Sequence, residues 1–390
     1  MKQPTTVAPT AHAVPARTIA SISLGIFAFA CGAVPTVAHA DVPPENATVS
    51  LKYLDYQDSQ PGIERIRVKA PALAISTPFA GDWSFDATVV SDAISGASPA
   101  FYTVARSFSQ LTDQRRAIDA SLTKYSTDGS LRVGVALSSE SDYDSKAVSA
   151  LGSVSTDDRN TTVKLGLGVT KDTIRSNADP RINESRSSVE WLLGVTRVLT
   201  QVDVVQLTST YANGQGFFSD PYKSLDNRPR SRQAATLTTR WNHFFDGSDG
   251  TARMSYRYYT DTNHINAHTV NLEYEQPLAQ GWALTPLLRM YTQSAARYFV
   301  DPNPAFPTRI NIPADFVPGE SLTSFDQRTS AYGAYTWGLK VGKVLDKWWS
   351  ADLKYERYEQ RAEWRWGGGG SPGMAPFSAR TWQLGLARRF

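Results

Sequence analysis

Three histidines follow residue 40 of this 390-residue chain, and histidine commonly binds metals or transfers protons in proteins. His264 and His268 would share one face of a helix and could bind zinc there. In a strand, however, four residues span roughly 13 Å, which is too far for one ion. A hydrolase would need a serine near His243, and the local spacing offers none. We therefore predict no catalytic residue, no metal and no cofactor, and we do not expect an enzyme.

Three carboxylates, Glu140, Asp142 and Asp144, alternate along the sequence at a predicted strand end, just before a tight reversal. Carboxylates this close repel one another unless a cation or an arginine lies among them. The first interpretation is a solvated outer loop. Pairing with lumen arginines and a calcium-like oxygen site are the alternatives.

Charged residues also recur at alternate positions inside segments that have the pattern of strands. The basic members are Arg65, Arg67, Lys69, Arg132, Arg240, Arg253, Arg257 and Arg289, and the acidic members are Asp86, Asp119, Glu190, Glu273, Glu275, Asp352 and Glu356. On the inner face of a membrane barrel, such charges require a wet lumen or a paired network. We expect Glu273 and Glu275 to match Arg257 and Arg289, because they lie on the strand between these two arginines.

The composition excludes several classes of protein. Hydrophobic residues make up 41% of the chain and charged residues 20%, which is not the composition of a disordered protein. No apolar run after residue 40 approaches the ~20 residues of a membrane-spanning helix. The net charge of +3 falls to +1 without residues 1–40, which hold Lys2, Arg17 and no acid. Nucleic acid is therefore not an expected partner.

The first 40 residues are typical of a signal peptide. Lys2 and Arg17 precede an apolar stretch, and Ala38 and Ala40 supply small residues before a cut at Asp41. A lipoprotein cut at Cys31, the only cysteine, is the minor alternative. We predict export across a bacterial inner membrane, with residues 41–390 forming a single domain.

The rest of the chain alternates apolar with small or polar residues, which is typical of strands with two different faces. In 130–141, for example, Leu131, Val133, Val135 and Leu137 alternate with Arg132, Gly134, Ala136 and Ser138. About sixteen segments have this pattern: 48–56, 63–76, 83–92, 114–126, 130–141, 145–154, 161–171, 186–199, 202–212, 232–245, 251–261, 265–277, 282–294, 331–345, 348–361 and 379–390.

The connections between these segments differ in length in a regular way. Those after even-numbered segments are short turns, whereas many of those after odd-numbered segments are long: 93–113, 172–185, 213–231, 295–330 and 362–378. Short turns at one end and long loops at the other are typical of an outer-membrane barrel. We therefore predict an all-β, closed antiparallel transmembrane barrel with short periplasmic turns. A spanning sheet must close because lipid leaves edge hydrogen bonds unmade.

Aromatic residues occur where two membrane interfaces would lie. Trp83, Trp282 and Trp349 begin strands at the short-turn end and Trp241 ends one there, while Tyr256, Tyr258 and Trp382 would form the opposite girdle. The chain ends in Phe390, with Trp382, Leu384 and Leu386 at the same parity. This ending resembles the terminal strand read by the bacterial barrel-assembly machinery, which we expect as a partner.

Several stretches resemble a family of bacterial outer-membrane proteins known only as a domain of unknown function. They include 92–99, 138–143, 219–223 with Arg228, 256–261, 267–269 and 289–294, in family order over nearly the whole chain after residue 40. The resemblance implies an outer-membrane barrel of a Gram-negative bacterium and no known substrate.

Two functions fit these observations. The first is a passive or gated, porin-like pore for small polar solutes, with Arg132, Arg240, Arg257, Arg289, Glu273 and Glu275 in the lumen. The second is a non-conducting barrel that docks an unknown periplasmic or surface protein. Its contact surface would be outer loops that include Asp92, Ser95, Gly96, Ser98, Pro99, Glu140, Asp142, Asp220 and Arg228. If the lumen is wet, Arg257→Ala should leave folding intact and change the conductance. If Arg257 belongs to a paired plug, the same change should destabilise the barrel.

Overall fold

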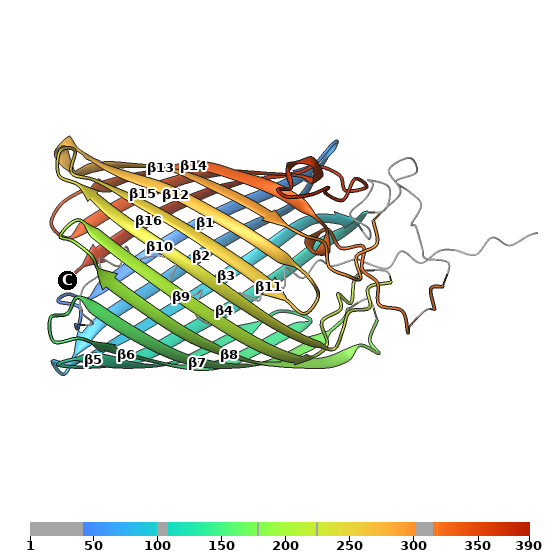
Figure 1. Cartoon of the computed structure of the whole chain (residues 1–390), viewed down its shortest axis with the longest axis horizontal. Coiled ribbons are helices and arrows are strands. Elements are labelled where there is room, and N and C mark those ends of the chain that lie inside the picture. The colour runs from blue at the N-terminus through green and yellow to red at the C-terminus, as the bar shows by residue number, and fades with distance from the viewer. Residues whose placement is uncertain (1–41, 100–107, 178, 224, 302–314, 318) are drawn as a thin grey trace, which may run out of the picture.

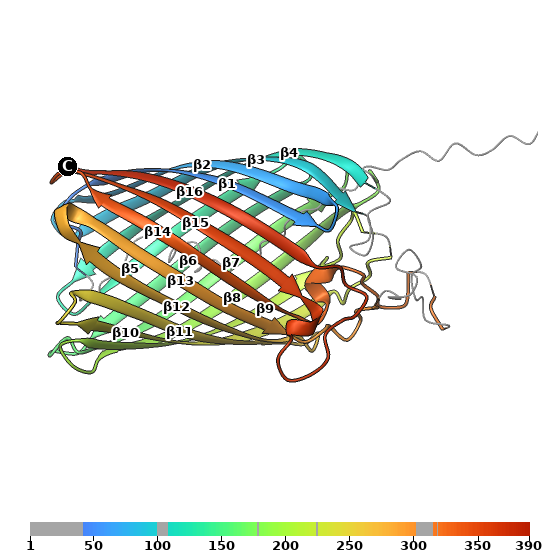
Figure 2. The same ribbon diagram turned by 90° about the horizontal axis from the view of Figure 1, so that it is seen from above.

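Sixteen antiparallel strands form a closed barrel in which β1 pairs with β16 (Figures 1 and 2). The structure is a computed structural model that describes residues 42–99, 108–177, 179–223, 225–301, 315–317 and 319–390, with side chains outside 94–112. The strands are β1 (Thr48–Gln60), β2 (Ile63–Phe79), β3 (Trp83–Pro99), β4 (Phe108–Ser126), β5 (Gly129–Ser139), β6 (Tyr143–Ser155), β7 (Thr161–Arg175), β8 (Asn183–Val198), β9 (Asp203–Gly216), β10 (Ser231–Phe245), β11 (Gly250–Asp261), β12 (Asn266–Leu278), β13 (Trp282–Gln293), β14 (Tyr332–Val344), β15 (Trp349–Arg361) and β16 (Phe377–Arg389). The predicted fold and strand number are confirmed. The predicted signal peptide, 1–40, lies outside the described residues.

The two ends of the barrel differ, as the connection lengths predicted. All connections after even-numbered strands, such as Ala279–Gly281 (η1), are short and lie at one end, together with the chain terminus (Figure 1). There the amide of Phe390 donates to the carbonyl of Ala47 at 2.9 Å, next to the β1–β16 pairing. The longer connections, which include η2 (Gln327–Thr329) and η3 (Ala362–Trp364), lie at the other end. We call these the short-turn end and the long-loop end.

The outer wall of the barrel is apolar, and the inner wall is polar or small. On β5, Leu131, Val133, Val135 and Leu137 are each about half exposed, whereas the alternate Gly134 is buried. The closed ladder of strands satisfies the backbone hydrogen-bonding groups of the wall, and the outward apolar side chains can contact lipid without a free-energy penalty. The barrel therefore spans a membrane by its strands.

No helix in the described part of the chain is long and apolar enough to cross a bilayer.

Aromatic residues lie at the predicted interfaces. Trp83 and Trp349 begin β3 and β15 at the short-turn end, and the Nε1 of Trp241 donates to Asp203 at 2.8 Å near the same end. On the outer face nearer the long-loop end, Tyr256 is exposed, and its hydroxyl lies 2.8 Å from Nδ1 of His268. His268 is thus an interfacial side chain, the interpretation that the strand spacing favours over a zinc site.

Several strands continue beyond the apolar belt at the long-loop end, where the sequence predicts loops. Residues 92–99 belong to β3 and pair with β4 and, in part, with β2, so the predicted loop of Asp92, Ser95, Gly96, Ser98 and Pro99 is wrong. Above the bilayer both strand faces meet water, so a strand no longer needs apolar alternation. Small and polar residues there do not mark a strand end.

The prediction that Arg67 and Lys69 point into the lumen is wrong for a related reason. Arg67 and Lys69 have the parity of the outward Leu73 and Ile75, so they lie on the outer wall. Arg67 forms an ion pair with Asp55 at 2.5 Å. At this height the outer wall is polar because it faces water and headgroups instead of acyl chains.

Candidate functional site

Three predicted lumen arginines lie on the inner wall of neighbouring strands. Arg240 (β10), Arg257 (β11) and Arg289 (β13) alternate with the outward Trp241, Tyr256 and Leu288, and all three arginines are exposed. A side chain that points into a closed barrel is exposed only where the interior has room for water. The lumen at this height therefore has room for water.

The expected pairing of these arginines is wrong. Glu275 pairs with Arg253 at 3.1 Å, and the Nε of Arg289 donates to Oδ1 of Asn271 at 2.6 Å. Arg257 faces Thr238 and Thr269 across the ladder. Among described residues, neither Arg257 nor Arg289 has a carboxylate within ion-pair distance. The sequence gives the face of each residue, but the register decides which residues are neighbours, and the register places Glu273 beside Arg253.

The opposite part of the inner wall carries an acidic group. Arg132 (β5) lies 3.8 Å from Asp86 (β3), and Asp119 (β4) shares their face. Arg132 and Asp86 are each about 30% exposed. Arg132 therefore lies on the inner wall, and this pair also lines an interior with room for water.

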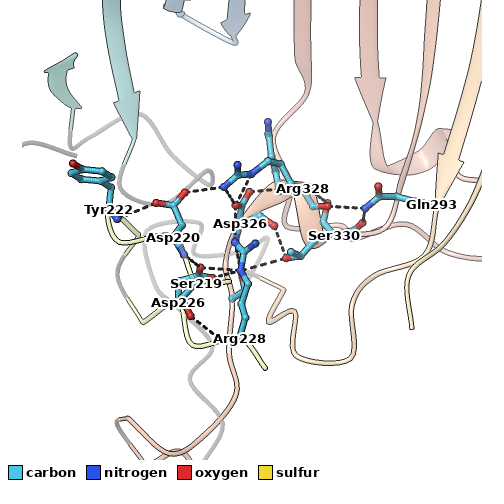
Figure 3. Close-up of polar contacts among 12 residues, drawn as sticks. Ser219, Asp220, Tyr222, Asp226, Arg228, Gln293, Asp326, Arg328 and Ser330 are labelled. Atoms are coloured by element: carbon cyan, nitrogen blue, oxygen red, sulfur yellow. Dashed lines mark hydrogen bonds and ion pairs between the residues drawn. The ribbon is translucent and has the colours of Figure 1, made fainter. Parts of the chain in front are cut away.

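A second group of charges lies at the long-loop end, where the β9–β10 and β13–β14 connections meet (Figure 3). The carboxylate of Asp326 is fully buried and receives hydrogen bonds from Arg228 at 2.9 Å and from Nε of Arg328 at 2.7 Å. Arg328 also contacts Asp220 at 2.8 Å, and Arg228 contacts Asp226 at 2.9 Å. We call this group of five residues the strap network.

The strap network continues across the mouth of the barrel. Asp220 accepts from the backbone amide of Tyr222 at 3.0 Å, and the hydroxyl of Tyr222 donates to the buried Asp142 between β5 and β6. The β5–β6 and β13–β14 connections start eight strands apart in a ring of sixteen, on opposite sides of the barrel. A chain of polar contacts therefore links connections that start on opposite sides of the long-loop opening.

The electrostatics of the strap network are set by burial and by the two arginines. Burial alone would raise the pKa of Asp326, but Arg328 and Arg228 outweigh it and hold this pKa below its ordinary value. For Asp226 burial dominates and raises the pKa. The pKa of Tyr222 rises to about 12 through burial and the nearby Asp142. Asp326 is therefore ionised at neutral pH, and its stabilising contribution is lost only as the pH falls toward its depressed pKa.

Glu140, Asp142 and Asp144 do not form one group in the structure. Asp144 pairs with Arg175 at 2.5 Å, and Asp113 takes its place beside Glu140 and Asp142, with ligand atoms within 4.8 Å of one another. Asp142 is fully buried, so the interpretation of a solvated loop is wrong for that residue. These oxygens have the spacing of a cation site, but an acidic cluster alone does not establish one.

We expect Glu140→Gln to stabilise the β5–β6 connection at pH 8 and to have little effect at pH 4. Burial raises the pKa of Glu140 to about 7, above its ordinary value. The free energy of unfolding of this loop therefore falls as the pH rises from about 4.5 to about 7, because Glu140 ionises more readily in the unfolded chain. Glutamine does not ionise, so the variant should be more stable than the wild type at pH 8 by about 1–3 kcal/mol. Hydrogen exchange at residues 140–145, measured at both pH values, tests this. Equal protection of both proteins at pH 8 would contradict it.

The sequence pointed to only part of the strap network. Asp220 and Arg228 were predicted as loop residues, and they do lie in the β9–β10 connection, but they are largely buried and not a free contact surface. Tyr222 falls within a stretch that carried the family resemblance. Asp326 and Arg328 were missed, because a loop without periodicity gives no signal of its distant partners.

A family model described as "Protein of unknown function (DUF3570)" matches residues 107–381, from just before β4 into β16. The chain belongs to this family. The match confirms the resemblance read from the sequence. None of the curated proteins compared matches the chain.

Solved structures with a similar shape are distant in sequence. "CdiB from Acinetobacter baumannii" is 10% identical with a TM-score of 0.48 over 86% of this chain, which spans 60% of that protein. A "Bacterial polysaccharide outer membrane secretin" is 9% identical with a TM-score of 0.49, covering 88% and 98% of the two chains. Pseudomonas aeruginosa OccK11 (OpdR) is 10% identical with a TM-score of 0.44, covering 90% and 99%.

Proposed function

We propose that this protein is a non-enzymatic outer-membrane pore for small polar solutes, with its short turns in the periplasm. The observation that carries the proposal is the exposure of Arg240, Arg257 and Arg289 on the inner wall of a closed barrel. Sixteen-strand barrels are wide enough for an aqueous channel unless loops fill them. Charged side chains that stay exposed at the height of the apolar belt support such a channel.

The strap network supports a pore whose outer opening is restricted. Ion pairs join the β9–β10 connection to the β13–β14 connection. The hydrogen bond from Tyr222 to Asp142 extends the link to the β5–β6 connection, on the opposite side of the barrel from β13–β14. A solute would pass beside the strap network, and breaking the contacts of this network would widen the path. We therefore infer a gated or size-limited pore instead of an unobstructed one.

Reconstitution into planar lipid bilayers tests the pore. We expect stepwise conductance increases in potassium chloride as single barrels insert, each of stable size. Heat-modifiable migration on gels serves as the control for folding. Folded protein that gives no conductance over many insertions would contradict the proposal.

A second candidate is a non-conducting barrel that docks another protein at its long-loop end. The observation in its favour is a set of exposed apolar side chains on the long-loop connections: Leu225, Val317, Leu322 and Trp366. Exposed apolar side chains on loops are suited to protein contact. An absence of conductance, combined with co-purification of one partner that is lost in Leu322→Ser, would favour docking over the pore.

We further expect Phe390→Ser to lower the amount of assembled barrel in the outer membrane. Phe390 directly follows β16, the strand that closes the barrel, and Cζ of Arg388 lies 4.6 Å from the centroid of its ring. If the assembly machinery reads this terminal aromatic residue, its loss slows insertion without changing the wall. The yield of heat-modifiable protein per cell measures the effect. An unchanged yield would contradict a role of Phe390 in assembly.

A further inference from the structure

One arc of the inner wall has more positive than negative charge. On β10 to β14 the inward cations are Arg240, Arg253, Arg257, Arg289 and Lys340, and the inward acids at this height are Glu273 and Glu275. Within the described chain, the ion pair of this group joins Arg253 to Glu275. Among the residues that the structure describes, Arg240, Arg257 and Arg289 have no carboxylate within ion-pair distance.

The register places the three unpaired arginines close together. Arg240, Ser255, Asn271 and Arg289 face one another in one row across β10 to β13, which spans roughly 14 Å at the usual strand spacing. Arg257 is the next inward residue after Ser255 on β11, a diagonal neighbour of Arg240 at about 7–8 Å. Because the wall is concave toward the lumen, the three side chains converge.

Hydrogen bonds orient part of this group. The Oδ1 of Asn271 holds the Nε of Arg289 at 2.6 Å, and its Nδ2 donates to Ser255 at 3.0 Å. Among the described residues, no hydrogen bond occupies the terminal nitrogens of Arg289. Guanidinium groups donate paired hydrogen bonds that match the geometry of carboxylate and phosphate oxygens.

The opposite wall strengthens the asymmetry. Asp86 and Asp119, with Arg132 beside them, lie on β3 to β5, eight strands from β11 to β13. An anion in the lumen is therefore repelled from one side and attracted to the other.

We propose that Arg240, Arg257 and Arg289 form a binding site for small oxyanions, carboxylates or phosphate, inside the pore. The site would select anionic solutes by concentrating them at one wall. The proposal rests on the pore proposed above, whose substrate class it names.

The test compares the wild-type barrel with the triple variant Arg240→Gln, Arg257→Gln, Arg289→Gln in planar bilayers. We expect an anion-selective reversal potential in a potassium chloride gradient, and a chloride current that inorganic phosphate or succinate reduces. The block should weaken by more than about tenfold in the triple variant, because the loss of even one charge-assisted hydrogen bond is expected to cost about that factor. The ratio of the phosphate to the succinate block distinguishes the two ligand chemistries.

Arg197→Gln is the matched control, because Arg197 is exposed on the outer face of β8 and loses the same charge. It should keep the wild-type selectivity and block. A conducting pore with no anion preference, or a block unchanged in the triple variant, would overturn the oxyanion site and leave the pore intact.

If no variant conducts, the pore itself fails, and binding decides the site separately. Calorimetry of the folded barrel in detergent with phosphate or succinate should then show binding by the wild type that the triple variant loses. Absence of binding to the wild type, or equal binding by both proteins, would overturn the site.

Discussion

Leu193→Arg is expected to destabilise the barrel by about 2–4 kcal/mol, the usual effect of an arginine on the lipid face near the bilayer midplane. Leu193 on β8 is 52% exposed and faces the outward Leu165 on β7. In the membrane these side chains meet acyl chains, where a guanidinium group loses its hydration. Urea-induced unfolding of the barrel in lipid vesicles measures the change.

The neighbouring residue provides the control. Leu192 lies on the inner wall, opposite Gly166 and Thr210, so Leu192→Arg places the same group in a hydrated lumen with little loss of stability. A similar loss for both variants would contradict the assignment of the two faces. A larger loss for Leu192→Arg would reverse it.

Asp326→Asn is expected to release the strap across the outer opening. The substitution removes the buried charge that neutralises Arg228 and Arg328, and removal of one partner from a buried ion pair commonly costs about 3–5 kcal/mol. The loss acts on the connections and not on the strand ladder. We expect faster hydrogen exchange in 217–230 and 319–331, together with a larger single-channel conductance, while heat-modifiable migration stays normal.

Asp179→Asn is the matched control, because Asp179 forms a surface ion pair with Arg181 in the β7–β8 connection. Exposed pairs of this kind contribute little, so exchange and conductance should match the wild type. Unchanged exchange in Asp326→Asn would show that the strap is held by other contacts. Increased exchange with unchanged conductance would show that the strap does not limit the pore.

The barrel could be predicted from the sequence because lipid imposes a strict pattern on each strand. Every second residue of β5 meets acyl chains and must be apolar, so Leu131 to Leu137 reveal the strand and its faces. The same pattern placed Arg257 and Arg289 in the lumen. It could not give their partners, since parity is a property of one strand and pairing depends on the register of two.

The outer part of the molecule could not be predicted for a different reason. Beyond the bilayer the alternation ends, so residues 92–99 resemble a loop although the ladder of β3 continues through them. The strap joins Arg228 to Asp326, 98 residues apart, and no local pattern connects two irregular segments. Only their three-dimensional packing brings the buried charges together.

The most direct test of a hydrated pore uses one cysteine in a barrel whose described residues contain none. Arg257→Cys places a thiol on the inner wall, and Tyr256→Cys places the control thiol on the lipid face of the same strand. Single-channel conductance is recorded before and after addition of a charged, water-soluble thiol reagent. We expect a stepwise fall in conductance for Arg257→Cys and none for Tyr256→Cys. An Arg257→Cys barrel that does not conduct, or whose conductance the reagent leaves unchanged, would contradict a water-filled lumen at this height.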